Sequence, residues 1–129
     1  MSQEPTYTIE VTKAQAEVIS TACELFARLR MGQFYDIVWK VFPDRMSEVN
    51  LSEIEKHLEV AGKLLRNKGS HESNDSERTE KSRRAWDLHQ VIRYRLSWDD
   101  KPQGGTTVNF YEPLVTAQET LAQIQRKDP

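Results

Sequence analysis

The stretch EKSRRAWDLHQVIRYRLSW, residues 80–98, decides the fold that we expect for this chain. Apolar side chains recur in it at steps of three and four residues, the period that places side chains on one face of an α-helix. That face consists of Ala85, Leu88, Ile92 and Leu96, and it is widened by Val91, Tyr94 and Trp98. The pattern predicts a helix over 80–98 at the centre of a hydrophobic, aromatic-rich core.

A second helix is predicted over residues 13–30. Thr12 stands three residues before Gln15, which is the spacing of a capping box at the start of a helix. Gly32 follows at the position where glycine often ends a helix in the left-handed conformation. We therefore expect the chain to break between two helices at Gly32.

A third main helix and one short helix are predicted between these two segments. Ser52 and Glu55 repeat the capping-box spacing and begin a helix over 53–66. Its apolar stripe consists of Ile54, Leu58, Ala61 and Leu65. Residues 33–42 place large apolar side chains around most of a helical circumference and end at Pro43. Such a short helix is either buried in the core or half covered by another chain.

Two short stretches have the pattern of β-strands. Tyr7, Ile9 and Val11 alternate with polar residues, which is the period of a half-buried strand. Residues 106–111 are rich in β-branched and aromatic side chains. We expect two short strands near the chain ends, paired with each other or across a subunit interface.

The remaining segments complete the expected fold. No apolar residue occurs from 66 to 84, so the centre of this segment, residues 67–82, is expected to be a mobile loop. Thr116 and Glu119 have the capping-box spacing and predict a short terminal helix. We therefore expect one domain over residues 1–129, of helix-dominated α+β class, with three main helices, one short buried helix and two short strands.

Composition limits the classes of function. The 129 residues suffice for one domain, and a net charge of −2 gives no overall field that would draw the chain onto nucleic acid or an anionic membrane. Sequence-specific DNA binding is therefore disfavoured. The chain shows neither a signal-peptide pattern nor an apolar run long enough to span a membrane, so we expect a cytoplasmic protein. Cys23 is the only cysteine and falls in an apolar helical pattern, which favours packing over reactivity.

Common catalytic motifs are missing from the sequence. It has no HExxH, CxxC, Walker, GxSxG or GxGxxG pattern, so we expect no metal, no cofactor and no enzymatic activity. A small hydrolase or nuclease stays an alternative through His89, which could act with Asp87 or Asp99. A histidine held by hydrogen bonds at the edge of an apolar face is the more frequent situation.

The strongest polar and aromatic constellation lies near the end of the 80–98 helix. Arginine presents paired planar donors to phosphate, and an aromatic ring can stack on a base or on a guanidinium group. The residues that we expect to contact a nucleotide-like ligand are Arg28, Gln33, Arg93, Arg95, Trp98 and Tyr111. In the alternative interpretation the arginines pair with acids such as Asp36 and Asp99, and the aromatic rings fill the core.

The stretches MGQF, residues 31–34, and VIRYRLSWDDKPQGGTTVNFYEP, residues 91–113, resemble a group of small proteins carried by tailed bacteriophages. The resemblance covers much of the chain outside the polar segment, and its motifs contain no obvious catalytic residue. It implies a phage accessory protein in the host cytoplasm. Such proteins are often counter-defence factors, and one class of them acts as sponges that sequester the nucleotide signals of bacterial immunity.

We therefore expect a non-enzymatic phage protein that binds and sequesters a small nucleotide-type immune signal. Apolar surface beyond what one chain of this length can bury also predicts a homo-oligomer. The alternative function is that of a protein-protein inhibitor or structural accessory protein, whose aromatic surfaces dock on a host or phage protein. A small hydrolase or nuclease ranks third.

Overall fold

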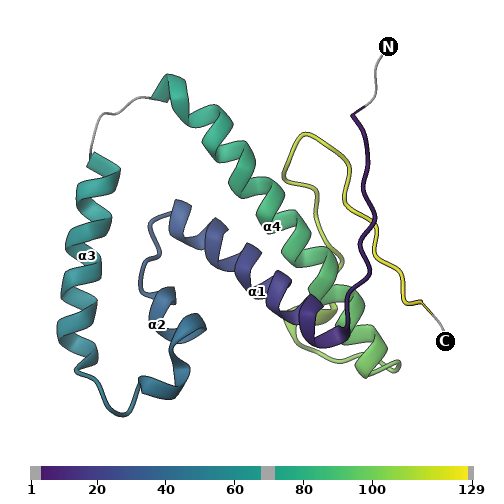
Figure 1. Ribbon diagram of the computed structural model, residues 1–129, viewed down its shortest axis with the longest axis horizontal. Coiled ribbons are helices and arrows are strands. Elements are labelled where there is room, and N and C mark those ends of the chain that lie inside the picture. Colours follow the sequence, from purple (N-terminus) through teal and green to yellow (C-terminus); the bar gives the residue numbers. More distant parts are fainter. Residues whose placement is uncertain (1–3, 68–71, 128–129) are drawn as a thin grey trace.

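The computed structural model of the chain describes residues 4–67 and 72–127. Within these residues the elements are α1 (Lys13–Arg30), α2 (Asp36–Val41), the 3-10 turn Pro43–Arg45, α3 (Leu51–Asn67), α4 (Glu72–Asp100) and the 3-10 turn Val108–Phe110. α1 and α4 pack along each other in opposite directions (Figure 1). α3 lies apart from this pair, and α2 lies between α1 and α3 in the chain (Figure 1).

No β-strand forms within the described residues, so the predicted α+β class with two strands is wrong and this part of the chain is all-helical. Residues 7–11 form no strand: Lys127 Nζ of the C-terminal segment donates a hydrogen bond to Glu10 Oε1 at 2.7 Å, but no strand pairing joins the two described segments, and the Tyr7 side chain is 87% exposed. Residues 108–110 form a 3-10 turn instead, whose first free N–H is capped by the Thr107 hydroxyl. β-branched residues favour a strand only where a neighbouring strand supplies partners.

The predicted helix over 13–30 is confirmed as α1. Thr12 Oγ1 accepts a hydrogen bond from the Gln15 N–H at 3.1 Å, and Gln15 Oε1 accepts one from the Thr12 N–H at 2.9 Å. These two bonds form the capping box. At the other end Gly32 has a φ of 89°, and its N–H bonds the Leu29 carbonyl at 3.0 Å. Glycine adopts this left-handed conformation without a steric penalty, which explains why the helix ends here.

α3 begins at Leu51, slightly earlier than its sequence pattern suggests. The cap is Asn50, whose Oδ1 accepts a hydrogen bond from the Glu53 N–H at 3.1 Å. Ser52, which the capping-box spacing selected, lies inside the first turn instead. Asn and Ser are almost equally good caps, so the sequence did not distinguish these two starting points.

α4 is longer than predicted. It starts at Glu72, so helix occupies most of the segment 67–82 that was expected to be a mobile loop, while residues 68–71 lie outside the described part of the chain. The predicted helix over 80–98 is the carboxyl-terminal part of α4, which ends at Asp100.

The buried core is small and partly polar. Its buried apolar residues are Ala16, Ala27, Val38, Val91, Ile92 and Ala117, and its buried polar residues are Ser20, Glu24, Glu80, Asp87, His89 and Gln90. No aromatic side chain of the described residues is buried to this degree, so the predicted aromatic-rich core is wrong. Leu88 is 36% exposed, because α4 turns the side that carries His89 toward α1.

The predicted terminal helix after Thr116 does not form, and residues 112–127 instead run over α4 without helix or strand (Figure 1). The Asp87 carboxylate accepts hydrogen bonds from the N–H groups of Thr116 and Ala117 at 3.0 and 2.9 Å. The Gln90 side chain bonds both the N–H and the carbonyl of Leu114, at 3.0 and 2.9 Å. The donors that would begin a helix at Thr116 are thus bound by side chains of another helix.

Candidate functional site

A network of charged side chains lies between α1, α2 and α4, with Glu24 at its centre. Glu24 is 8% exposed, accepts a hydrogen bond from Arg28 Nε at 2.9 Å and pairs with Lys40 Nζ at 3.0 Å. Burial acts to raise the pKa of the Glu24 carboxyl, but the hydrogen bonds from Lys40 and Arg28 outweigh it and hold the pKa below its ordinary value. Glu24 therefore stays ionised at neutral pH and ties α2 to α1.

Arg28 extends the network in three directions. Its Nη1 donates to Gln33 Oε1 at 2.9 Å, and its Nε lies 3.6 Å from Asp36 Oδ2 at the start of α2. Its guanidinium carbon lies 5.5 Å from the centroid of the Trp86 ring on α4, within the range of a cation–π contact. One side chain thus contacts the end of α1, the start of α2 and the middle of α4.

His89 joins α4 to α1 inside this network. Its Nδ1 lies 2.8 Å from Ser20 Oγ, and its Nε2 lies 4.0 Å from Glu24 Oε1. Burial lowers the pKa of the imidazole; the charges of Arg93 and Lys40 add to this, whereas Glu24 opposes it. The ring is therefore mostly neutral at pH 7 and acts as a hydrogen-bonded bridge between the two helices.

The acids that the hydrolase alternative assigned to His89 are engaged elsewhere. Asp87 binds the backbone of the C-terminal segment, and Asp99 Oδ2 accepts a hydrogen bond from Arg95 Nε at 3.3 Å. His89 itself is 6% exposed. A general base must reach a substrate proton, so this arrangement offers His89 a structural role in place of a catalytic one.

The network carries one unbalanced positive charge. Arg93 Nε is buried and has no hydrogen-bond partner in the described residues. Burial lowers the pKa of the Arg93 guanidinium, with Glu24 opposing the shift, but an arginine stays protonated at neutral pH. The network thus contains three cations and two carboxylates. The cations are Arg28, Lys40 and Arg93, and the carboxylates are Glu24 and Asp36.

The six residues predicted to contact a ligand are divided between two parts of the molecule. Arg28 and Gln33 are hydrogen bonded to each other, and Arg93 lies near the same Glu24 carboxylate. The remaining three, Arg95, Trp98 and Tyr111, belong to the other end of α4 and the segment that follows it. Trp98 lies about 18 Å along α4 from Trp86, the ring beneath Arg28, at the usual helical rise.

Trp98 packs within the turn that follows α4. Its ring meets Phe110 edge-on, with centroids 5.3 Å apart. Gly104 has a φ of 81°, and a Cβ atom there would come within 2.9 Å of the Trp98 ring. The glycine therefore lets the turn close over the indole. Tyr111, which follows Phe110, is 61% exposed and lies on the surface.

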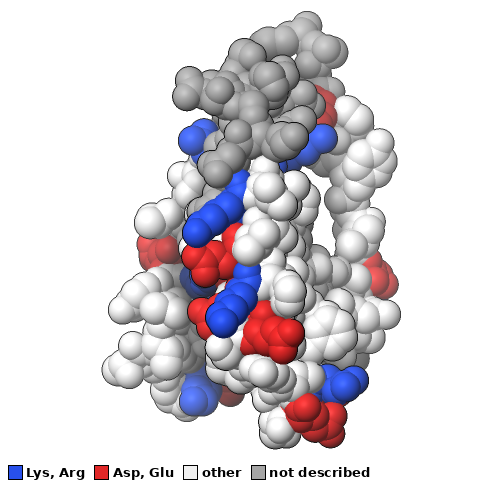
Figure 2. All heavy atoms as spheres, turned by 90° about the vertical axis from the view of Figure 1, so that its left-hand side faces the viewer, with Lys and Arg blue, Asp and Glu red and all other residues white. Residues whose placement is uncertain are grey.

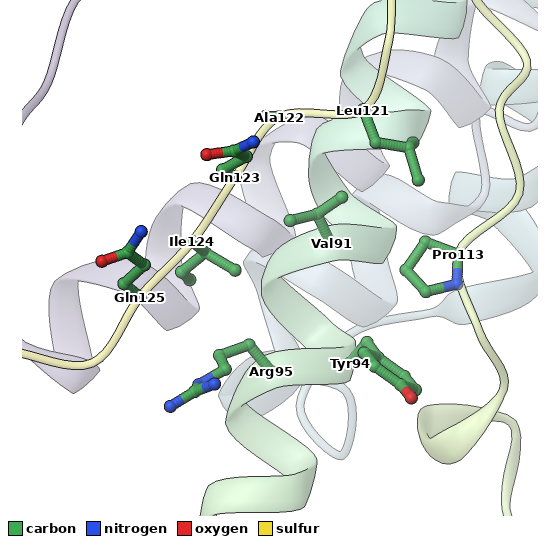
Figure 3. A pocket seen from close by; sticks show the side chains of 9 residues that line it. All are labelled: Val91, Tyr94, Arg95, Pro113, Leu121, Ala122, Gln123, Ile124 and Gln125. Atoms are coloured by element: carbon green, nitrogen blue, oxygen red, sulfur yellow. The ribbon is translucent and has the colours of Figure 1, made fainter.

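A groove of about 400 Å³ runs between α4 and the C-terminal segment (Figure 3). Val91, Leu121 and Ile124 face one another across it. Tyr94 and Arg95 line it from adjacent positions on α4 and point in different directions (Figure 3). Arg95 is the only one of the six predicted residues that lines this groove.

α2 is half exposed, so the predicted burial of this short helix in the core is wrong, whereas its half-coverage by another chain stays a prediction. Only Val38 is buried, at 5% exposure, whereas Trp39, Val41 and Phe42 are 47%, 46% and 50% exposed. The Tyr35 ring meets Trp39 edge-on, with centroids 5.6 Å apart. We call Trp39 and the C-cap residue Phe42, which are three residues apart and lie on the same side, the apolar face of α2; Val41 lies on nearly the opposite side of the helix. The ion pairs of Asp36 and Lys40 hold this face in place.

The inner residues of α1 were missed because they are small or polar. Ala16, Ser20, Glu24 and Ala27 follow one another at steps of four and three residues, which is the helical period. A search for that period among all residue types would have placed Glu24 on the inner face. Asp87 and Gln90 left no such signal, because their partners are backbone groups that are distant in sequence.

The chain matches no protein-family model, and neither a curated protein nor a solved structure matches it. None of the described helices has the length and apolar character needed to cross a membrane. Among the described residues, no three His, Cys, Asp or Glu side chains gather in a way that could hold a metal ion.

Proposed function

We propose that this chain is an accessory protein that docks on another protein through the apolar face of α2. The observation that carries this proposal is the exposure of Trp39 and Phe42, at 47% and 50%. The charged residues of the same segment, Asp36 and Lys40, form ion pairs with residues of α1. Trp is enriched among the residues that dominate binding energy at protein interfaces, and aromatic side chains are common there.

The charged network supports this function because it fixes the position of α2. A helix of six residues is too short to be stable alone, and only Val38 of α2 is buried. Buried ion pairs add little net stability, but they impose a defined geometry because each charge must find its partner. Glu24 and Arg28 therefore hold Trp39 and Phe42 in one orientation before a partner arrives, which reduces the ordering cost of binding.

The test is quantitative capture of a partner by the 129-residue chain expressed in bacterial cells. The resemblance to phage proteins makes a host or phage protein the expected class of partner. We expect Trp39→Ala and Phe42→Ala each to weaken binding of the identified partner by roughly 30-fold, the effect of losing about 2 kcal/mol.

Tyr7→Ala is the matched control, since Tyr7 is an aromatic side chain of 87% exposure that lies far from α2 in sequence. It should leave binding unchanged. Equal binding by the wild-type chain and by both α2 variants would contradict the proposal.

A second candidate function, sequestration of a small nucleotide-type immune signal, is favoured by the groove beside α4. Its volume of about 400 Å³ is in the range of small-molecule sites, and it combines an apolar floor with Arg95, Tyr94 and the amides of Gln123 and Gln125. The arginine could bind a phosphate group through its paired N–H donors, and the tyrosine ring could stack on a nucleotide base. The Arg95–Asp99 pair would have to open for this binding.

Native mass spectrometry of the 129-residue chain with a panel of cyclic nucleotides tests the second candidate. The expected result is a stoichiometric adduct that Arg95→Ala weakens at least tenfold, while Arg30→Ala, outside the groove, leaves it unchanged. A bare protein with every nucleotide of the panel would reject sequestration of these signals.

A further inference from the structure

α3 has an apolar side that its own chain covers only in part. A groove of about 310 Å³ between α2 and α3 is lined by Ile37, Val38, Phe42, Arg45, Val49, Ile54 and Leu58. Ile54 and Leu58 are half-buried beside it. Further along α3, Val60, Leu64 and Leu65 are 56%, 61% and 65% exposed. The second half of the apolar side is therefore open to solvent.

The polar side of α3 is satisfied within the helix. Lys63 Nζ pairs with Glu59 Oε1 at 3.3 Å, and His57 Nε2 lies 3.8 Å from Glu53 Oε1. Charged side chains of both signs form a column on the face of the molecule that α3 presents in Figure 2. The charged side of α3 faces solvent with its charges paired, so the side that still lacks a packing partner is the apolar one.

Apart from α2 at the groove, no other described helix covers that side. α1 and α4 pack against each other, and α3 makes no close backbone contact with either of them. An isolated helix of 17 residues is only marginally stable in water, so α3 needs an apolar partner along its length.

The sequence of α3 matches a second copy of itself in the antiparallel direction. Its stripe of Ile54, Leu58, Ala61 and Leu65 has steps of four, three and four residues, which read the same in both directions. An antiparallel pair therefore places Ile54 opposite Leu65 and Leu58 opposite Ala61. In such a pair both copies use the same surface, as a twofold axis requires.

Charge favours the same direction of pairing. Residues 51–59 hold three acidic residues and one lysine, whereas residues 60–67 hold two basic residues and no acidic one. An antiparallel pair places each acidic half beside the basic half of its partner, and a parallel pair places like charges together. The helix dipoles also oppose each other in the antiparallel arrangement.

We propose that α3 pairs with α3 of a second copy of this chain in an antiparallel, twofold-symmetric dimer. The stripes of the two helices pack into each other's grooves and cover Leu64 and Leu65. The dimer stripe adjoins the apolar face of α2 at the groove, where Phe42 lies with Ile54 and Leu58. Trp39 and Leu65 lie outside that groove, so Trp39→Ala tests the docking function and Leu65→Glu tests the dimer, and either proposal can fail alone.

Light scattering coupled to size-exclusion chromatography tests the dimer. The wild-type chain should have twice the 15.0 kDa mass of one copy. Leu65→Glu should weaken the dimer roughly 100-fold or more, because the interface loses a buried leucine at each of its two ends and gains a carboxylate opposite Ile54 there. Leu65 is 65% exposed in the single chain, so the substitution breaks no buried contact within one copy. The variant should still fold, and its helical circular dichroism should fall by no more than the share of α3, while α1 and α4 keep theirs.

Ser52→Glu is the matched control, since it adds the same charge to α3 outside the apolar stripe. It should leave the mass unchanged. A wild-type chain of 15.0 kDa at every concentration, or a dimer that Leu65→Glu does not weaken, would overturn the proposal.

Cysteine cross-linking in a Cys23→Ser chain tests the direction of pairing. Ile54→Cys and Leu65→Cys proteins should each stay uncross-linked alone and should form a disulfide-linked dimer when mixed, because these positions face each other only across antiparallel helices. Self-cross-linking of Ile54→Cys as efficient as that of the mixture would show parallel pairing and overturn the proposal.

Discussion

His89 is a titratable ring held in its neutral form between two helices. Ser20 Oγ lies 2.8 Å from Nδ1, and the charged groups around the ring are Glu24, Arg93 and Lys40. Burial lowers the pKa of the ring, so the folded chain binds this proton less readily than the unfolded chain. Protonation of His89 therefore opposes folding.

The sign of this linkage gives a prediction for pH. Above the ordinary pKa of about 6.5 the ring is neutral in both the folded and the unfolded chain, and His89 does not lower the free energy of unfolding. As the pH falls from there through the lowered pKa of the folded state, the unfolded chain binds the proton more readily, and the free energy of unfolding decreases. Urea unfolding measured from pH 7.5 downward should show a falling free energy of unfolding below about pH 6.5. His89→Gln should flatten this decline in the same window. An unchanged slope in this variant would mean that other groups cause the decline.

α1 shows how local signals define one element. Its start is fixed by two hydrogen bonds between Thr12 and Gln15, and its end by Gly32, all within a few residues of the helix. Its inner face depends on contacts with α4, such as the bond between Ser20 and His89. The ends of the helix are thus local features, whereas its orientation is not.

Removing the cap should weaken the fold by a predictable amount. Thr12→Ala leaves the Gln15 N–H without its acceptor and should lower the free energy of unfolding by about 1 kcal/mol, as measured by urea denaturation. Thr8→Ala, in the exposed segment before α1, is the control and should change it by less than about 0.5 kcal/mol. Equal effects of the two substitutions would show that the cap is energetically unimportant.

At the scale of the whole molecule, the C-terminal segment packs along α4 and is held there by buried polar side chains of that helix. Asp87 binds the backbone of Thr116 and Ala117, and it also accepts a hydrogen bond from the Thr116 hydroxyl. Glu80 Oε2 accepts a hydrogen bond from the Gln118 N–H at 2.6 Å. These bonds bury Ala117 against α4 and form one wall of the groove beside Arg95.

Asp87→Ala should release this segment. It leaves the N–H groups of Thr116 and of the buried Ala117 without acceptors, and an unsatisfied buried N–H costs about 1–3 kcal/mol. Hydrogen exchange of the amides from 114 to 118 should become at least tenfold faster, while the amides at the centre of α1 keep their protection. Glu119→Gln, which alters only the exposed pair with Arg84, is the control and should have little effect. Unchanged exchange in Asp87→Ala would contradict this role.

Parts of the candidate site could be predicted from the sequence. Arg28, Gln33 and Arg93 were singled out, and they lie in or beside the Glu24 network. The acids that neutralise them were weighed only as an alternative, and Glu24 was not considered. Glu24 becomes the centre of the network only because α2 folds back and brings Lys40 to α1. No local sequence pattern indicates this fold-back.

The sequence by itself determined α1, α3 and the carboxyl-terminal part of α4, because caps, glycine conformation and helical periodicity act within a few residues. The start of α4 at Glu72 did not follow from these local signals. Only the tertiary structure decided the fates of residues 7–11, 106–111 and 116–124. The β-branched residues there permit a strand, and the capping residues permit a helix. Which element forms depends on which distant groups make hydrogen bonds to the backbone N–H and C=O groups of these segments. Asp87 bound the donors at Thr116, and no described strand was present to pair with residues 7–11. A backbone hydrogen bond requires a partner in space, and a sequence specifies such partners only through the complete fold.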